Sequence, residues 1–176
     1  EIFTNFGNIS WFLLSFTTVL PIVFELYLWL TTFPKLNTYY SQGPKIKFTR
    51  PFLILILVLG LVSVFFMGLI PFYLFWLLWV SIIPALAVPM ILANWWTPFD
   101  SIGKDGNWTQ IMLIAIATLI TGFFWEFWNY GSEVFHGFAP TNPNYWIYSI
   151  PFLDKFRPFS QMPILGYFGY LFFGVV

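Results

Sequence analysis

The sequence contains no cysteine, only one histidine and few charged residues. The absence of cysteine excludes a disulfide framework and any thiolate metal site within the chain. A single histidine excludes two-histidine haem ligation and histidine-rich membrane iron sites formed by this chain alone. Charged residues make up 8% of the chain, against about 25% in ordinary soluble proteins. Seven basic and seven acidic side chains are too few to cover a soluble surface, and their balance provides no basic surface for nucleic acid.

Apolar and aromatic residues dominate what remains. Hydrophobic residues account for 59% of the chain and aromatic residues for 24%, including 24 phenylalanines. Tryptophan and tyrosine are expected in belts at the membrane interfaces, but the phenylalanine content exceeds what a belt requires. It indicates broad surfaces that face lipid or partner subunits. We therefore predict an all-α, polytopic transmembrane helical bundle in which residues 1–176 form one domain.

The apolar runs predict about five membrane crossings, each of which needs about 20 residues. The run 51–93 carries no charge and should form two helices, joined by a tight turn near Gly68 and Pro71. Pro84 and Pro89 predict a kink or an early end in the second of these. The expected spans are 9–33, 51–69, 72–93, 108–130 and 162–176. Because the sequence opens without methionine and the last run is short, we expect a fragment with a truncated fifth span.

Lysine and arginine determine the expected orientation. The segments 34–50 and 94–107 should share one side of the membrane, and they hold five of the seven basic residues. We predict that these two loops are cytoplasmic. The segment 131–161, rich in proline, asparagine and aromatic residues, is expected to lie along the outer surface.

Two glutamates within the expected spans form the candidate intramembrane polar sites. Glu25 follows Pro21, which cannot donate a helical hydrogen bond, and an ionisable group at membrane depth is costly and often functional. Glu25 is expected either to form a site for a proton, a cation or a polar headgroup, or to be a carboxyl group that is protonated, is hydrogen-bonded to a neighbouring helix or reaches the nearby interface. Glu126 lies between Trp125 and Trp128, which place it near the outer interface, where a carboxylate costs less. The helical rise puts the two glutamates at different depths, so they should not form an acid–base pair.

Glu133 and His136 have the i,i+3 spacing of di-iron carboxylate bundles, which require a second such pair and two further glutamates. His136 is therefore expected to pack in the interfacial segment, with axial ligation of a haem or chlorophyll-type pigment as the alternative. The sequence indicates no catalytic set and no metal site. No cofactor is assignable, and lipids, carotenoids or chlorophyll-type pigments would be held through partner subunits.

Small residues mark the expected helix contacts. Thr118 and Gly122 have the spacing that allows close approach in the fourth span, and Gly166 and Gly169 have the same role in the fifth.

Two motifs in the last third of the chain belong together. Residues 125–129 read W-E-x-W-N, and residues 162–170 read M-P-x-L-G-Y-x-G-Y, with an aromatic segment between them. They resemble a family of bacterial integral membrane proteins that has no assigned function. The resemblance implies the bacterial inner membrane and a last helix that continues past Val176. The chain also has a fainter similarity to membrane lycopene-cyclase domains. The acidic pair expected before the last helix of those domains is missing here, since 162–176 contains no carboxylate.

Three functions follow from these observations. The first is an accessory or structural subunit of a larger bacterial membrane complex, respiratory or photosynthetic, that contacts partner helices, lipids or pigments. The second is an intramembrane enzyme that modifies a lipid or isoprenoid with Glu25 or Glu126 as the acid. The third is an ion-coupled transporter that uses Glu25, although no inverted repeat is visible.

Overall fold

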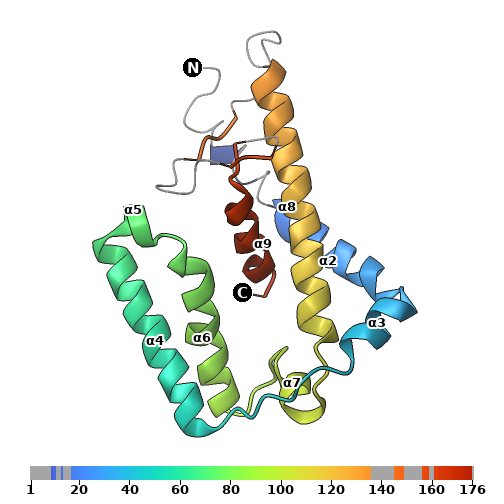
Figure 1. Cartoon of the computed structure of the whole chain (residues 1–176), viewed down its shortest axis with the longest axis vertical. Helices are drawn as coiled ribbons and strands as arrows, with labels where there is room; N and C mark the ends of the chain where they lie inside the picture. Colours follow the sequence, from blue (N-terminus) through green and yellow to red (C-terminus); the bar gives the residue numbers. More distant parts are fainter. Residues whose placement is uncertain are drawn as a thin grey trace.

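The computed structural model describes residues 9–10, 13, 17–135, 145–148, 156–158 and 161–175, and all regular structure within them is helical (Figure 1). The helices are α2 (Val19–Thr31), α3 (Pro34–Tyr40), α4 (Arg50–Leu69), α5 (Pro71–Leu74), α6 (Leu77–Leu92), α7 (Asp100–Asp105), α8 (Thr109–Phe135), the 3-10 turn η1 (Ile164–Gly166) and α9 (Tyr167–Phe173). The prediction of an all-helical chain is confirmed over the described residues.

Two helices, α4 and α8, are long and apolar enough to cross a membrane. A third crossing is added if α2 and α3 count together as one broken span. The helix α6 and the η1–α9 segment are apolar but shorter than a bilayer requires. The described part of the chain therefore has two or three helices of membrane-spanning character, and the bundle of five spans stays a prediction.

The helices α4 and α6 form an antiparallel hairpin at one side of the molecule (Figure 1). The break between them falls at Ile70, and Pro71 starts α5, where its missing N–H removes no helical hydrogen bond. The helix α6 then continues through Pro84 and Pro89 to Leu92, so the early end expected at these prolines does not occur.

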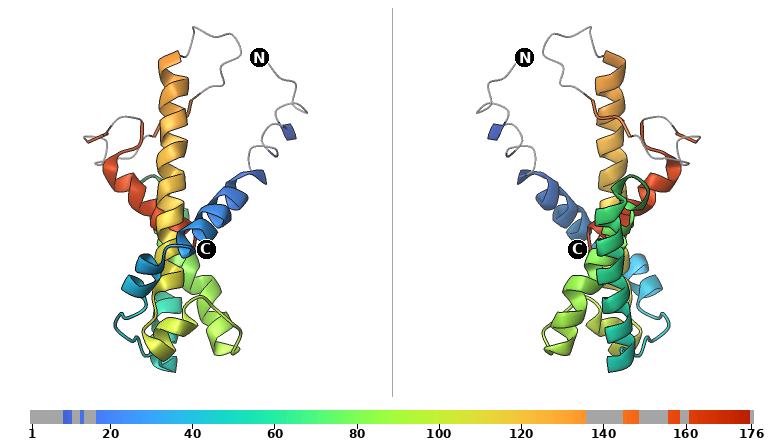
Figure 2. Two further views of the ribbon diagram at one scale, coloured as in Figure 1. Left: turned by 90° about the vertical axis from the view of Figure 1, so that its right-hand side faces the viewer. Right: turned by 90° about the vertical axis from the view of Figure 1, so that its left-hand side faces the viewer.

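The helix α8 is the central element, with α2 and α9 diverging from its opposite sides (Figure 2). Where α2 meets α8, Leu30, Leu113 and Ala117 form a buried apolar cluster. The helix α8 ends at Phe135, five residues beyond the end expected from the sequence. Glu133, which the sequence analysis assigned to the interfacial segment, therefore lies on α8.

The helix α2 covers the second half of the first expected span, 9–33, and a sharp bend follows it. The helix α2 ends at Thr31, and the chain turns by 91° into α3. Pro34 begins α3, and proline cannot continue the hydrogen-bond ladder of the preceding helix. Asn37 stabilises the turn, since its Nδ2 donates to the carbonyl oxygens of Thr31 at 2.7 Å and Phe33 at 3.1 Å.

The segments that precede α4 and α8 lie together at one end of the molecule (Figure 1). The Gly43 N–H donates to the Gly106 carbonyl oxygen at 2.8 Å, and the Trp108 indole N–H donates to the Pro44 carbonyl oxygen at 2.9 Å. Gly106 ends α7 with a φ of +72°, a conformation that favours glycine. These bonds join the two basic loops that the sequence assigns to one side.

Gly60 sets the distance between α4 and α6. A Cβ atom at Gly60 would lie 2.9 Å from the Pro84 ring and 3.1 Å from the Ser81 carbonyl oxygen. We expect Gly60→Leu to destabilise the hairpin by about 1–3 kcal/mol, the usual cost of overpacking. Thermal unfolding in detergent micelles measures the effect.

Gly68→Ala is the matched control, because a Cβ atom at Gly68 meets nothing within 4 Å. Alanine is the better helix former, so this variant should be as stable as the wild type or slightly more stable. Equal loss of stability in both variants would show that the close approach at Gly60 is unimportant.

Candidate polar site around Glu126

The most buried charged side chain in the described part of the chain is Glu126, on α8. Its exposed fraction is 0%. The Tyr148 hydroxyl donates to Glu126 Oε1 at 2.7 Å, and the Tyr170 hydroxyl donates to the same oxygen at 2.9 Å. The carboxyl group therefore joins three parts of the chain: α8, the segment 145–148 and α9. The position of Glu126 near the outer membrane interface stays a prediction, and the structure shows that its side chain is buried within the protein.

Asn129 holds the segment 145–148 against α8. Its Nδ2 donates to the Trp146 carbonyl oxygen at 2.9 Å, and its Oδ1 accepts from the Trp146 N–H at 2.8 Å. Asn129 follows Glu126 by three residues and therefore lies on the same helix face, where it is 2% exposed. These two hydrogen bonds to the main chain of Trp146 position Tyr148, which follows two residues later.

A second set of polar contacts continues from this segment. Arg157 donates through one guanidinium nitrogen to Gln161 Oε1 at 2.6 Å and through the other to the Tyr148 carbonyl oxygen at 3.2 Å. Gln161 Nε2 in turn donates to Glu133 Oε1 at 2.6 Å. The Glu133 carboxylate is thus bound by an amide.

The metal and pigment hypotheses for Glu133 and His136 gain no support from this arrangement. Over the described residues, no group of three histidine, cysteine, aspartate or glutamate side chains is placed to hold a metal ion. His136 lies outside the described residues.

Glycine determines how closely α9 approaches α8. A Cβ atom at Gly122 would overlap the Tyr170 ring, and one at Gly174 would overlap the Thr118 hydroxyl. A Cβ atom at Gly169 would lie 3.7 Å from the Trp79 ring of α6, in ordinary contact, whereas one at Gly166 would overlap the Met162 side chain. Thr118 and Gly122 thus lie in the α8–α9 contact, and Gly169 lies where α9 meets α6.

Tyr167 completes the cluster. Its ring lies against Tyr170, with 6.1 Å between the ring centroids, and it lies within electrostatic range of the Glu126 carboxyl group. The Tyr167 hydroxyl oxygen is buried and has no hydrogen-bond partner in the described part of the chain. A buried hydroxyl in this state can bond to a water or to a bound molecule.

Glu25 has different surroundings. It lies on an exposed face of α2 together with Ile22, Leu28 and Trp29, which are also exposed. No hydrogen bond or ion pair joins the Glu25 carboxyl group to a residue that the structure describes. The two candidate glutamates therefore differ: one is buried and bonded, and the other is exposed and unpaired.

The residues of the two sequence motifs meet at this site. Trp125, Glu126 and Asn129 face Tyr148, Tyr170 and the main chain of Trp146. Sequence reasoning missed Tyr148 and the role of Asn129. The presence of W-E-x-W-N together with G-Y-x-G-Y was the available signal. No protein-family model, curated protein or solved structure matches the chain.

Replacement of Glu126 should distinguish its acceptor role from its volume. Glu126→Gln keeps an oxygen that accepts from both tyrosines, whereas Glu126→Leu leaves two buried hydroxyls without an acceptor. Each orphaned group costs about 1–3 kcal/mol, so Glu126→Leu should lower the unfolding temperature in detergent far more than Glu126→Gln. Equal losses would show that these hydrogen bonds do not stabilise the fold.

The pH dependence of stability should depend on Tyr148. Burial, and then the hydrogen bond to Glu126, raise the pKa of Tyr148 well above the ordinary value of 10.0. The unfolded chain therefore ionises first, so the stabilisation is complete below about pH 10 and is lost as the pH rises further. Unfolding between pH 8 and 11 should show a smaller decline for Tyr148→Phe. Tyr39→Phe, at a side chain that is 77% exposed, should behave like the wild type.

Proposed function

We propose that the chain is an accessory integral membrane subunit of a larger complex in the bacterial inner membrane, and that the exposed face of α2 packs against a helix of a partner subunit. The observation that carries this proposal is the unpaired Glu25 carboxyl group on an otherwise apolar exposed surface. A respiratory or photosynthetic complex would provide such a partner, and lipids or pigments would contact the chain through it.

The depth of Glu25 supports this interpretation. Glu25 precedes Thr31, the last residue of α2, by six residues, which corresponds to about 9 Å along the helix axis. Helical side chains tilt toward the N-terminus of their helix, so the carboxyl group points away from the bend between α2 and α3. A charged side chain in hydrocarbon costs about 2.5–3.5 kcal/mol. A hydrogen-bond donor or cation on a partner helix would remove that cost.

The α4–α6 hairpin adds a second surface that suits a subunit. Only Leu53 and Gly60 of α4 are buried, and most of the other side chains of this apolar helix are exposed and available to lipid or to partner helices. The Glu126 carboxyl group and the Asn129 amide, by contrast, bond to other parts of the chain and tie it together. Among the described acidic residues of α2 and α8, Glu25 is therefore the side chain without such a bond.

Purification of the tagged chain from its native membranes in mild detergent tests this function. Native mass spectrometry should find the wild type with a second protein. Glu25→Leu should lose that protein, whereas Glu25→Gln, which keeps hydrogen-bonding capacity, should retain part of it. Asp105→Asn, which changes an exposed carboxylate at the end of α7, is the control and should retain it fully. A stable monomer with its own activity would overturn the proposal.

A second candidate function is an intramembrane enzyme that acts on a lipid or isoprenoid with Glu126 as the acid. The unpartnered Tyr167 hydroxyl beside Glu126 favours it, because that hydroxyl could orient a bound substrate.

Glu126→Gln, which we expect to keep the fold, tests the enzymatic alternative. If the carboxyl group donates a proton, this variant should abolish one lipid or carotenoid product in whole-cell profiles, whereas Glu25→Gln should not. Lipid and carotenoid profiles that are unchanged in both variants would rule out the enzymatic function.

A further inference from the structure

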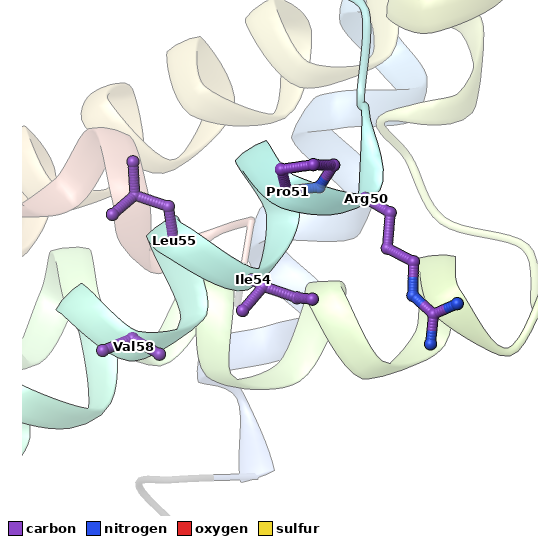
Figure 3. A pocket seen from close by; sticks show the side chains of 5 residues that line it. All are labelled: Arg50, Pro51, Ile54, Leu55 and Val58. Carbon is purple, nitrogen blue, oxygen red and sulfur yellow. The ribbon is translucent and has the colours of Figure 1, made fainter.

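A shallow apolar groove runs along the outer face of α4 (Figure 3). Five residues on one side of the helix line it: Arg50, Pro51, Ile54, Leu55 and Val58. Side chains four residues apart form ridges on a helix. The groove accordingly lies between the ridge of Arg50, Ile54 and Val58 and the ridge of Pro51 and Leu55.

The groove has a charged end and an apolar remainder. Arg50 stands at the start of α4, and Figure 3 shows its guanidinium group extending away from the apolar lining. From Arg50 to Val58 the groove follows the helix for about 12 Å. Ile54, Leu55 and Val58 are all exposed, so nothing in the described part of the chain fills it.

The positive charge at the groove mouth is not neutralised by the described residues. Arg50 is exposed and forms no hydrogen bond or ion pair with them, and Lys45 and Lys47, just before it, are likewise exposed and unpaired. Lys104, in the neighbouring loop, differs because it lies 3.8 Å from a carboxylate oxygen of Asp100. Three cations that the described residues leave unpaired therefore lie within six residues at the start of the long apolar helix α4.

We propose that this groove binds an anionic phospholipid, with the phosphate against the Arg50 guanidinium group and one acyl chain along the apolar lining. A guanidinium group matches phosphate through two parallel hydrogen bonds. Lys45 and Lys47 select a headgroup with net negative charge, because basic residues beside a membrane helix attract anionic lipids. A ligand with a charged head and a hydrocarbon tail satisfies both parts of the groove. This proposal requires no partner subunit and stands independently of the role proposed for Glu25.

Native mass spectrometry of the full chain in detergent with added phosphatidylglycerol and phosphatidylcholine of identical acyl chains tests the site. The wild type should retain phosphatidylglycerol in preference to phosphatidylcholine. Arg50→Gln should reduce that preference about fivefold, the effect of one cation near an anionic headgroup. Lys104→Gln removes a cation that is already paired and should leave the preference unchanged.

A second pair of variants tests the acyl-chain half of the groove. Val58→Trp should fill the groove and lower the retention of both lipids, while Leu69→Trp, at an exposed position at the far end of α4, should lower neither. The proposal is overturned if the wild type retains the two lipids equally, or if Arg50→Gln and Lys104→Gln act alike. It is also overturned if Val58→Trp displaces a bound protein and leaves lipid retention unchanged.

Discussion

The fold around α8 depends on one requirement, that the fully buried Glu126 carboxyl group be hydrogen-bonded. A buried carboxyl group without partners is strongly unfavourable, and here both donors come from elsewhere in the chain. Tyr148 belongs to the segment 145–148 and Tyr170 to α9. Each donor depends on a further residue: Asn129 fixes the segment that carries Tyr148, and Gly122 leaves room for the Tyr170 ring.

The α4–α6 hairpin is built by a different principle. It has no comparable polar centre among the described residues, and its helices approach closely because Gly60 faces Pro84. Contact with the rest of the chain runs through α9, where the Trp79 and Phe173 rings meet edge to face at 5.6 Å. The molecule thus combines a polar, precisely bonded part around α8 with an apolar hairpin whose outer surface is left to other molecules.

Hydropathy predicted the features that depend on local sequence. The class of fold, the span at 51–69 and the break before Pro71 follow from apolar runs and proline chemistry, and α4 and α5 lie within a residue of them. The environment of Glu126 was not predictable in this way. Its bonding partners lie 22 and 44 residues away in the chain, and no periodicity links positions so far apart. The bend after α2 was also not predicted, although it depends on residues close in sequence, Pro34 and the Asn37 side chain, because hydropathy does not register their hydrogen bonding.

The contact between Asn129 and residue 146 has a consequence for how the chain can diverge. Both hydrogen bonds reach the main chain of Trp146, and the Trp146 ring is itself exposed. Any residue except proline, which lacks the N–H, supplies the same pair of groups. The part of this attachment that Asn129 provides therefore depends on the asparagine and not on the identity of residue 146. Related chains could carry other residues at position 146 and keep this pair of main-chain hydrogen bonds, although a change would remove the contact between the Trp146 side chain and Tyr148.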